Sequence, residues 1–217
     1  MRTSSTGTSS VKRLLITAAL AALTACSAIG SAQERSARAE LYLCEGCEAV
    51  HERDPASLSW RTHIAGESEP GERMVVRGTV YQTDGATPAP GVIIYMHQTN
   101  AAGAYAGGSN ESEWSRRHGR LRGWAKTDRT GLYEFATVKP APYPEHTEPA
   151  HVHLTVLEPA RRPYYIDDVV FAGEYRVDAE YRRSREERGG SGIVSLARSP
   201  DGTWIAERDV ILEPHPE

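Results

Sequence analysis

Two histidines separated by one residue, His151 and His153, are the sharpest chemical feature of this 217-residue sequence. On a β-strand, residues i and i+2 project from the same face, so both imidazoles would point the same way. Neutral imidazole is the commonest protein ligand for metals. The pair therefore predicts a metal site, although two half-buried histidines held by hydrogen bonds would leave the same pattern.

Two tyrosines upstream offer further ligands. Tyr143 stands between Pro142 and Pro144, which hold it on a stiff, extended backbone. Tyr105 closes a glycine-containing turn. Each tyrosine alone is more often a packing residue, but with the histidines they make a set of two phenolates and two imidazoles. Phenolates are hard anionic donors, and this favours a trivalent, oxygen-preferring metal over zinc or copper.

Short strands separated by turns must position these residues. Apolar or alternating runs predict about eight strands, at 73–82, 91–98, 121–127, 132–138, 151–158, 165–171, 192–198 and 204–212. The turn sequences at 128–131 and 199–202 predict two hairpins. This spacing is typical of an all-β sandwich or barrel. The highly charged segment 174–188 is expected to be a short helix or a loop with a solvated face.

The N-terminal segment 1–25 has the character of an export signal. It carries three basic residues and no acidic one, and its apolar run at 14–23 is too short to span a membrane. The run ends in LTAC, which resembles the lipobox of bacterial lipoproteins and predicts lipidation of Cys26. The alternative is an ordinary signal peptide cleaved near Ser31. We expect an extracytoplasmic protein of the bacterial cell envelope, attached to the membrane only by this lipid, or otherwise periplasmic or secreted.

Residues 26–72 form a polar, turn-rich extension before the domain at 73–217. Its CxxC motif, Cys44 and Cys47, predicts a local disulfide, which an oxidising compartment permits. Reduced thiols, a metal contact and redox catalysis are the alternatives. A zinc knuckle would need two further ligands, and the sequence has no second CxxC.

The composition excludes several classes of protein. Hydrophobic residues make up 39% of the chain and charged residues 25%, which suits a soluble protein with a buried core. It does not suit collagen, a coiled coil or a polytopic membrane protein. The formal net charge of −4 argues against a nucleic-acid partner held by phosphate contacts.

Across residues 75–171 the sequence resembles the intradiol ring-cleavage dioxygenases. The motifs that carry the resemblance are GTVY (78–81), DG (84–85), PGV (90–92), HQTNAAGAY (97–105), RG (122–123), TD (127–128), GLYEF (131–135), VKP (138–140), PYP (142–144) and PAHVH (149–153). The resemblance implies a β-sandwich that binds one non-haem Fe(III) through two tyrosines and two histidines. It also implies a catechol-like aromatic diol and O2 as substrates and ring cleavage between the two hydroxylated carbons. Members of the family are often oligomeric, so the resemblance also admits a homo-oligomer.

Residue by residue, the resemblance makes Tyr105 and His151 the equatorial ligands and Tyr143 and His153 the axial pair. It gives Tyr143 a catalytic role, because the axial tyrosine leaves the metal and takes a proton when the catechol binds. The surroundings of the ligands depart from the family at three positions. Glu148 stands where an arginine supports the substrate, Asp168 where the family has glutamine, and His97 where tryptophan is common.

The altered positions make Glu148 and Asp168 candidate substrate contacts. Arg122 is a weaker candidate, and with its basic neighbours Arg116, Arg117 and Arg120 it could replace the missing positive charge. His118, in the same basic loop, is another candidate for contact with the substrate.

Two other functions compete with the dioxygenase. A non-catalytic β-sandwich that binds a ligand at the cell envelope would have no reason to keep the four-ligand set. A zinc hydrolase using His146, His151 and His153 would leave the tyrosines unexplained.

Overall fold

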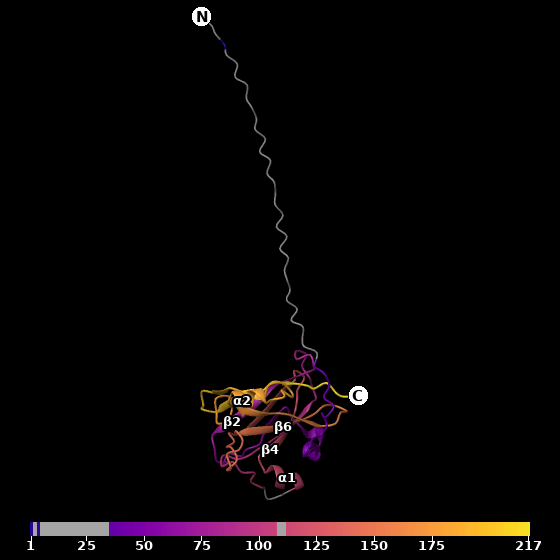
Figure 1. Cartoon of the computed structure of the whole chain (residues 1–217), viewed down its shortest axis with the longest axis vertical. Coiled ribbons are helices and arrows are strands. Elements are labelled where there is room, and N and C mark those ends of the chain that lie inside the picture. Colours follow the sequence, from indigo (N-terminus) through magenta and orange to yellow (C-terminus); the bar gives the residue numbers. More distant parts are fainter. Residues whose placement is uncertain (2–3, 5–34, 108–111) are drawn as a thin grey trace. The chain divides into compact units, whose positions relative to one another are not determined.

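The computed structural model (Figure 1) describes residues 1, 4, 35–107 and 112–217, and two β-sheets form the framework of this part of the chain. Almost all of the predicted signal segment 1–25, and the predicted lipidation site Cys26, lie outside the described residues. No helix among those described is long and apolar enough to cross a membrane.

The two sheets make the predicted all-β sandwich. One has the order β1-β5-β2-β10-β9, with β11 also paired to β2, and the other has the order β4-β3-β6-β7-β8. The first contains β1 (Arg61–His63), β2 (Arg73–Tyr81), β5 (Leu132–Val138), β9 (Leu196–Arg198), β10 (Trp204–Glu207) and β11 (Val210–Ile211). The second contains β3 (Ile93–Gln98), β4 (Arg122–Lys126), β6 (His151–Leu157), β7 (Tyr164–Phe171) and β8 (Ile193–Val194). The short helices are η1 (Cys47–Glu52), η2 (Pro55–Ser57), α1 (Glu113–His118) and α2 (Ala179–Arg183).

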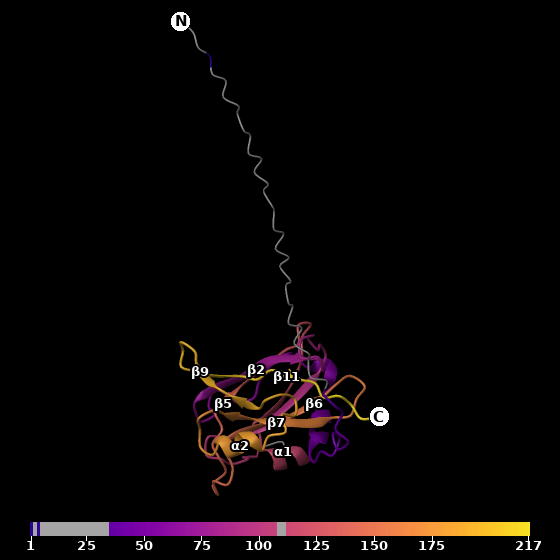
Figure 2. The ribbon, with the colours of Figure 1, turned by 45° about the horizontal axis from the view of Figure 1, so that its top comes forward.

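Alternate residues of the five-stranded sheet point into the main core between the sheets. Ile94 and Met96 of β3 and Leu154 of β6 are fully buried there. Burying each such side chain contributes about 1.5 to 3 kcal/mol. Their neighbours in sequence point to the opposite face of the same sheet, which we call the outer face. Figure 2 shows α1 and α2 on the side of β7 that faces away from β2.

The N-terminal extension covers part of the outer face. Ala49 and Val50 of η1 pack against Tyr95 and Trp124, and the Trp124 indole donates to the Ala49 carbonyl (3.1 Å). This cover explains why the β3 sequence is apolar on both faces. The extension also supplies β1, which pairs with β5, so residues 26–72 contribute a strand to the sandwich.

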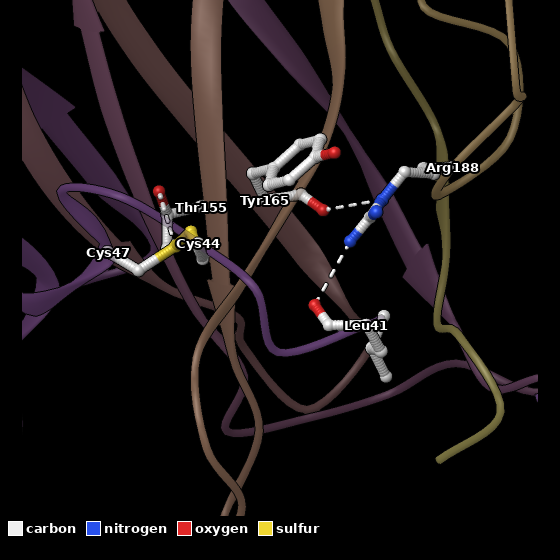
Figure 3. The surroundings of a disulfide bond; sticks show 6 residues. All are labelled: Leu41, Cys44, Cys47, Thr155, Tyr165 and Arg188. Carbon is white, nitrogen blue, oxygen red and sulfur yellow. Dashed lines mark hydrogen bonds between the residues drawn. A yellow bond between two sulfur atoms is a disulfide. The ribbon is translucent and has the colours of Figure 1, made fainter. Parts of the chain in front are cut away.

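A disulfide joins Cys44 to Cys47, the first residue of η1. Cys47 is buried and its sulfur lies 3.9 Å from the Thr155 hydroxyl on the outer face of β6 (Figure 3). Nearby, the buried guanidinium of Arg188 donates to the carbonyls of Leu41 and Tyr165. Arg188 therefore attaches Leu41 of the extension to β7, while the local disulfide constrains the turn that ends in buried Cys47 beside Thr155.

Three local predictions were wrong. The turn at 128–131 is not a hairpin, because β4 and β5 belong to different sheets and the turn arches between them. The predicted strand at 192–198 is two strands, β8 and β9, because the chain passes from one sheet to the other at Ser195. The predicted strand at 204–212 is likewise divided into β10 and β11. The predicted hairpin at 199–202 is confirmed by the antiparallel pairing of β9 with β10.

Candidate metal centre

The histidine pair lies on the outer face of β6. His151 is buried and His153 is partly buried, whereas Val152 between them points into the main core. The pairing of β6 with β7 is irregular at this point, since Val152 pairs with Val169 but Leu154 pairs with Ile166. The extra residue makes a bulge in β7 opposite His153. The bulge presents Asp168 to His153, with 2.9 Å between Oδ1 and Nδ1.

Two loops are joined so that the tyrosines meet. Asn100 organises the loop that leads to Tyr105, because its side chain accepts from the backbone of Ala102 (2.9 Å) and Ala104 (3.1 Å). Gly103 has a φ of 77°, and a Cβ at this position would lie 2.0 Å from the Pro142 carbonyl oxygen. Only glycine permits so close an approach with that backbone conformation. The loop carrying Tyr105 therefore rests directly on the residue before Tyr143.

The four predicted ligand atoms converge. The Tyr105 hydroxyl lies 2.9 Å from Nε2 of His153 and 3.0 Å from the Tyr143 hydroxyl. Nε2 of His151 lies 3.2 Å from the Tyr143 hydroxyl and 3.1 Å from Nε2 of His153. Donor atoms that share one metal lie about 2.0 to 2.2 Å from it, so neighbouring donors lie roughly 3 Å apart. The spacing of the four atoms suits a single bound cation.

The proton arrangement also suits a cation. His151 Nδ1 lies 2.8 Å from the Pro149 carbonyl, which can only accept, so Nδ1 carries the proton and Nε2 presents a lone pair. His153 Nδ1 likewise faces the Asp168 carboxylate. Two imidazole lone pairs then face each other across 3.1 Å, an arrangement that a positive ion between them would stabilise. Ligating histidines usually have such partners on their other nitrogen.

The titration behaviour of these groups follows from burial and from Asp168. Burial raises the pKa of Tyr105 and of Tyr143 above the ordinary value, so both are protonated phenols until a cation displaces the proton. Burial also opposes charge on His153 and Asp168, but their mutual attraction outweighs it. The pKa of His153 is therefore raised and that of Asp168 lowered.

A second ligand set shares the histidines. His151, His153 and Asp168 each offer an atom within 4.8 Å of the other two. Asp168 already accepts from His153 Nδ1, whereas among the described residues the two phenol oxygens contact only each other and the two Nε2 atoms. The set of two tyrosines and two histidines is therefore the better candidate for binding a cation. Asp168 then acts as the carboxylate that orients His153.

A stack of aromatic rings backs the centre, and sequence reasoning did not find it. The His97 ring lies parallel to that of His153, with centroids 4.5 Å apart, and to that of His118 at 4.0 Å. Burial lowers the pKa of His97 well below its ordinary value and that of His118 to about 4, so both are neutral. The signal was present in the strand pattern, because His97 is on the same face of β3 as Tyr95 and pairs directly with His153.

A cleft of about 640 Å³, which we call the α2 cleft, opens beside His151. It is lined by Thr147, Glu148, Pro149, His151 and Asp168 and by Arg176, Asp178, Glu180, Tyr181, Ser184 and Arg185 from the α2 region. The charged segment 174–188 was expected to be only a solvated surface. The structure instead makes it one wall of the cleft beside the metal centre.

Glu148 and Arg122, two further predicted substrate contacts, lie in different parts of the outer side of the sheet. Glu148 is exposed and lines the α2 cleft, next to Pro149. Arg122 lies on the outer face of β4, paired with Glu52 (2.6 Å) and bonded to Ser112 (2.9 Å). No contact found among the described residues joins Arg122 to the four ligand atoms, and its role in substrate binding stays a prediction.

His146 does not join the histidine pair. It is exposed, adopts a positive φ of 51°, and packs its ring edge-on against Tyr175 at 5.9 Å. The zinc-hydrolase alternative needs His146 beside His151 and His153, so the observed arrangement gives it no support.

With the sandwich and the convergence of the four predicted ligands established, comparison with known proteins gives the family. A family model described as dioxygenase matches residues 46–188, well over half of the chain. The chain belongs to the intradiol ring-cleavage dioxygenase family. Members of this family are oxidoreductases that cleave catechol-type rings with O2 and use non-haem iron.

Solved structures share the fold at low sequence identity. The dioxygenase domain of a carbohydrate-binding fusion protein from Streptomyces sp. SirexAA-E aligns with a TM-score of 0.54 and 23% identity, over 74% of this chain and 92% of that domain. An intradiol ring-cleavage dioxygenase from Tetranychus urticae gives 0.53 and 18%, over 75% and 89%. Catechol 1,2-dioxygenase from Acinetobacter sp. ADP1 gives 0.54 and 20% over 71% of this chain, which spans only 57% of that enzyme.

Proposed function

We propose that this protein is a non-haem Fe(III) dioxygenase that cleaves a catechol-like ring between its two hydroxylated carbons with O2. The observation that carries the proposal is the convergence of Tyr105, Tyr143, His151 and His153, whose four donor atoms form a ring with sides of 2.9 to 3.2 Å. A non-catalytic binding module would gain nothing from burying two phenols against two imidazole lone pairs.

The chain's own residues would prepare the site as follows. The Pro149 carbonyl and Asp168 keep the protons of His151 and His153 on Nδ1, so that both Nε2 atoms stay available as ligands. With a cation bound in the cage, Tyr143, the less deeply buried of the two tyrosines, would be held as a phenolate and could take a proton from an incoming catechol, becoming a neutral phenol again. Bound Fe(III) would supply Lewis acidity toward the catechol oxygens and a template for the reaction with O2.

Colour and oxygen uptake test the proposal. Protein loaded with Fe(III) should be reddish from phenolate-to-iron charge transfer, and it should consume O2 when given a catechol. Tyr105→Phe and Tyr143→Phe should each shift or weaken the absorption band, whereas the control Tyr165→Phe, on exposed Tyr165 of β7, should not. Protein that stays colourless after Fe(III) loading would refute the proposal, and an unchanged band in both ligand variants would refute the ligand assignment.

We also propose that the protein works outside the cytoplasm, anchored by a lipid on Cys26. The basic, acid-free start, the apolar run at 14–23 and the following LTAC support this. The disulfide between Cys44 and Cys47 fits an oxidising compartment. Expressed in a bacterium, the full chain should enter the membrane fraction and incorporate labelled fatty acid, and Cys26→Ser should do neither. Equal incorporation by the variant would exclude this anchor.

A further inference from the structure

The α2 cleft has room for more than a catechol ring. Its volume of about 640 Å³ lies within the range of pockets that hold drug-sized ligands. His151 is both a predicted ligand and part of the cleft wall. A catechol bound at the metal centre from this side would therefore direct a ring substituent into the cleft.

The charges that line the cleft are unbalanced. They comprise the carboxylates of Glu148, Asp168, Asp178 and Glu180 and the guanidinium groups of Arg176 and Arg185. The carboxylates outnumber the guanidinium groups, so the cleft presents an excess of negative charge to anything that enters it.

Several of these groups already have partners. Asp168 faces His153, and Asp178 caps α2 by accepting from the backbone of Glu180 and Tyr181, both at 2.9 Å. Arg185 lies over the Tyr181 ring, 4.2 Å from its centroid. Arg185 also donates to the Ser184 hydroxyl (3.1 Å), and the Arg176 guanidinium lies 5.8 Å from the centroid of the Tyr175 ring, so each guanidinium group has a contact of its own on the α2 side.

Glu148 is placed differently. Within the described part of the chain, no side chain forms a hydrogen bond or an ion pair with the Glu148 carboxylate, and the same holds for Glu180, which also lines the cleft. Glu148 also directly precedes Pro149, whose carbonyl fixes His151. A carboxylate without a side-chain partner thus lines the cleft three residues before a predicted metal ligand.

We propose that Glu148 is a specificity-determining residue which makes the α2 cleft favour catechols with a positively charged substituent, such as an aminoalkyl chain, over those with a carboxylate. This inference rests on the proposed ring-cleavage function. Glu148 would attract the ammonium group and repel the anion, with Glu180 adding to the same field from the facing wall. Like charges placed together are a common means of rejecting the wrong ligand.

Three catechols of similar size test the proposal: 4-(2-aminoethyl)catechol, uncharged 4-ethylcatechol and 3,4-dihydroxyphenylacetate. Their dissociation constants would be measured without O2 on the iron-loaded protein, from the change in charge-transfer absorption. Their kcat/KM values would come from oxygen uptake. Both measurements would use the wild type, Glu148→Gln and Glu148→Arg. Glu145→Gln is the matched control, since Glu145 is an exposed carboxylate of the same loop that does not line the cleft.

The wild type should prefer the amine over the acid by about 10-fold or more, as expected when an exposed charge attracts one ligand and repels the other. Glu148→Gln should remove about 10-fold of this preference and Glu148→Arg should reverse it, with the value for 4-ethylcatechol in each variant as the reference for the two charged catechols. Glu145→Gln should leave the ratio within about 2-fold of the wild type. Added salt at 0.5 M should weaken the preference, because it screens exposed charges.

Two failures are distinguishable. Cleavage of 4-ethylcatechol with an amine-to-acid ratio unaffected by Glu148→Gln would overturn the specificity proposal and leave the proposed function intact. Equal changes in Glu148→Gln and Glu145→Gln would also overturn it, since the effect would then belong to the net charge of the loop. Failure of all three catechols to bind or react would overturn both proposals.

Discussion

Asp168 should control how tightly the centre holds its metal. Its Oδ1 lies 2.9 Å from Nδ1 of His153, and the β7 bulge is what brings the two together. The carboxylate fixes the orientation of the imidazole, keeps the proton on Nδ1 and increases the electron density at Nε2. Asp168→Ala removes all three effects, whereas Asp168→Asn keeps an acceptor oxygen and removes only the charge.

The expected loss of metal affinity follows from this difference between Asp168→Ala and Asp168→Asn. Removing a partner that orients a ligating histidine typically weakens metal binding by about 10- to 100-fold. We place Asp168→Asn near the lower limit and Asp168→Ala near the upper one, which correspond to about 1.4 and 2.8 kcal/mol of binding free energy. The fold should persist, because both side chains lie on the outer face and neither belongs to the main core.

Competition with a chelator gives the measurement. Each variant would be titrated with Fe(III) buffered by nitrilotriacetate, and occupancy would be followed by the phenolate charge-transfer absorption. Asp167→Asn is the matched control, because Asp167 belongs to the same bulge but accepts from the Glu187 backbone (3.0 Å) instead of from a ligand. If Asp168→Ala binds Fe(III) as tightly as Asp167→Asn does, Asp168 does not orient His153 and the reasoning fails.

Three further predictions concern the loop that carries Tyr105 and the contacts of the N-terminal extension. Gly103→Ala should destabilise the fold by about 1 to 3 kcal/mol and weaken Fe(III) binding, because the alanine Cβ would clash with the Pro142 carbonyl. Urea unfolding measures the first effect and chelator competition the second. Unaltered metal binding would contradict the inference that this contact positions Tyr105. Glu213→Ala should lower the free energy of unfolding in urea by about 2 to 4 kcal/mol, because buried Glu213 forms ion pairs with Arg35 and Arg38. A loss below about 0.5 kcal/mol, as for an ordinary surface substitution, would show that these ion pairs do not stabilise the fold. Cys47→Ser should lose about 2 kcal/mol, as expected for opening so short a loop, and reduction of the wild type should match it in a thermal unfolding scan.

The strand pattern predicted correctly that His151 and His153 share one face of β6, because one geometric rule governs the direction of side chains along a strand. Alternation along β6 placed Val152 and Leu154 in the core and His151 and His153 on the opposite face. The rule needs only the local sequence, so the shared face of the histidines was predictable. The order of the strands and the arch at 128–131 depend on which sheet each strand joins, and turn sequences alone do not encode this.

The tyrosine positions and the cleft wall were harder to predict, for different reasons. Tyr105 and Tyr143 meet because two loops distant in sequence pack at Gly103, a contact that family resemblance implied but spacing could not show. Segment 174–188 has the composition of a solvated surface, and its charges do remain accessible. What the sequence could not reveal is that this surface faces His151 across a cleft.

The two faces of β6 have different roles, since one packs in the core and the other carries the predicted metal ligands. The inner face contributes buried apolar side chains to a core that both sheets share, so changes there affect the whole fold. The outer face is completed by parts added from elsewhere: η1 with its disulfide, the two tyrosine loops and the α2 region. Glu148 is exposed on one of these added parts, so it can vary without a cost to the core. Under the proposed function, a sandwich built in this way can keep its metal ligands fixed while the charge of Glu148 in the α2 cleft sets which catechols bind.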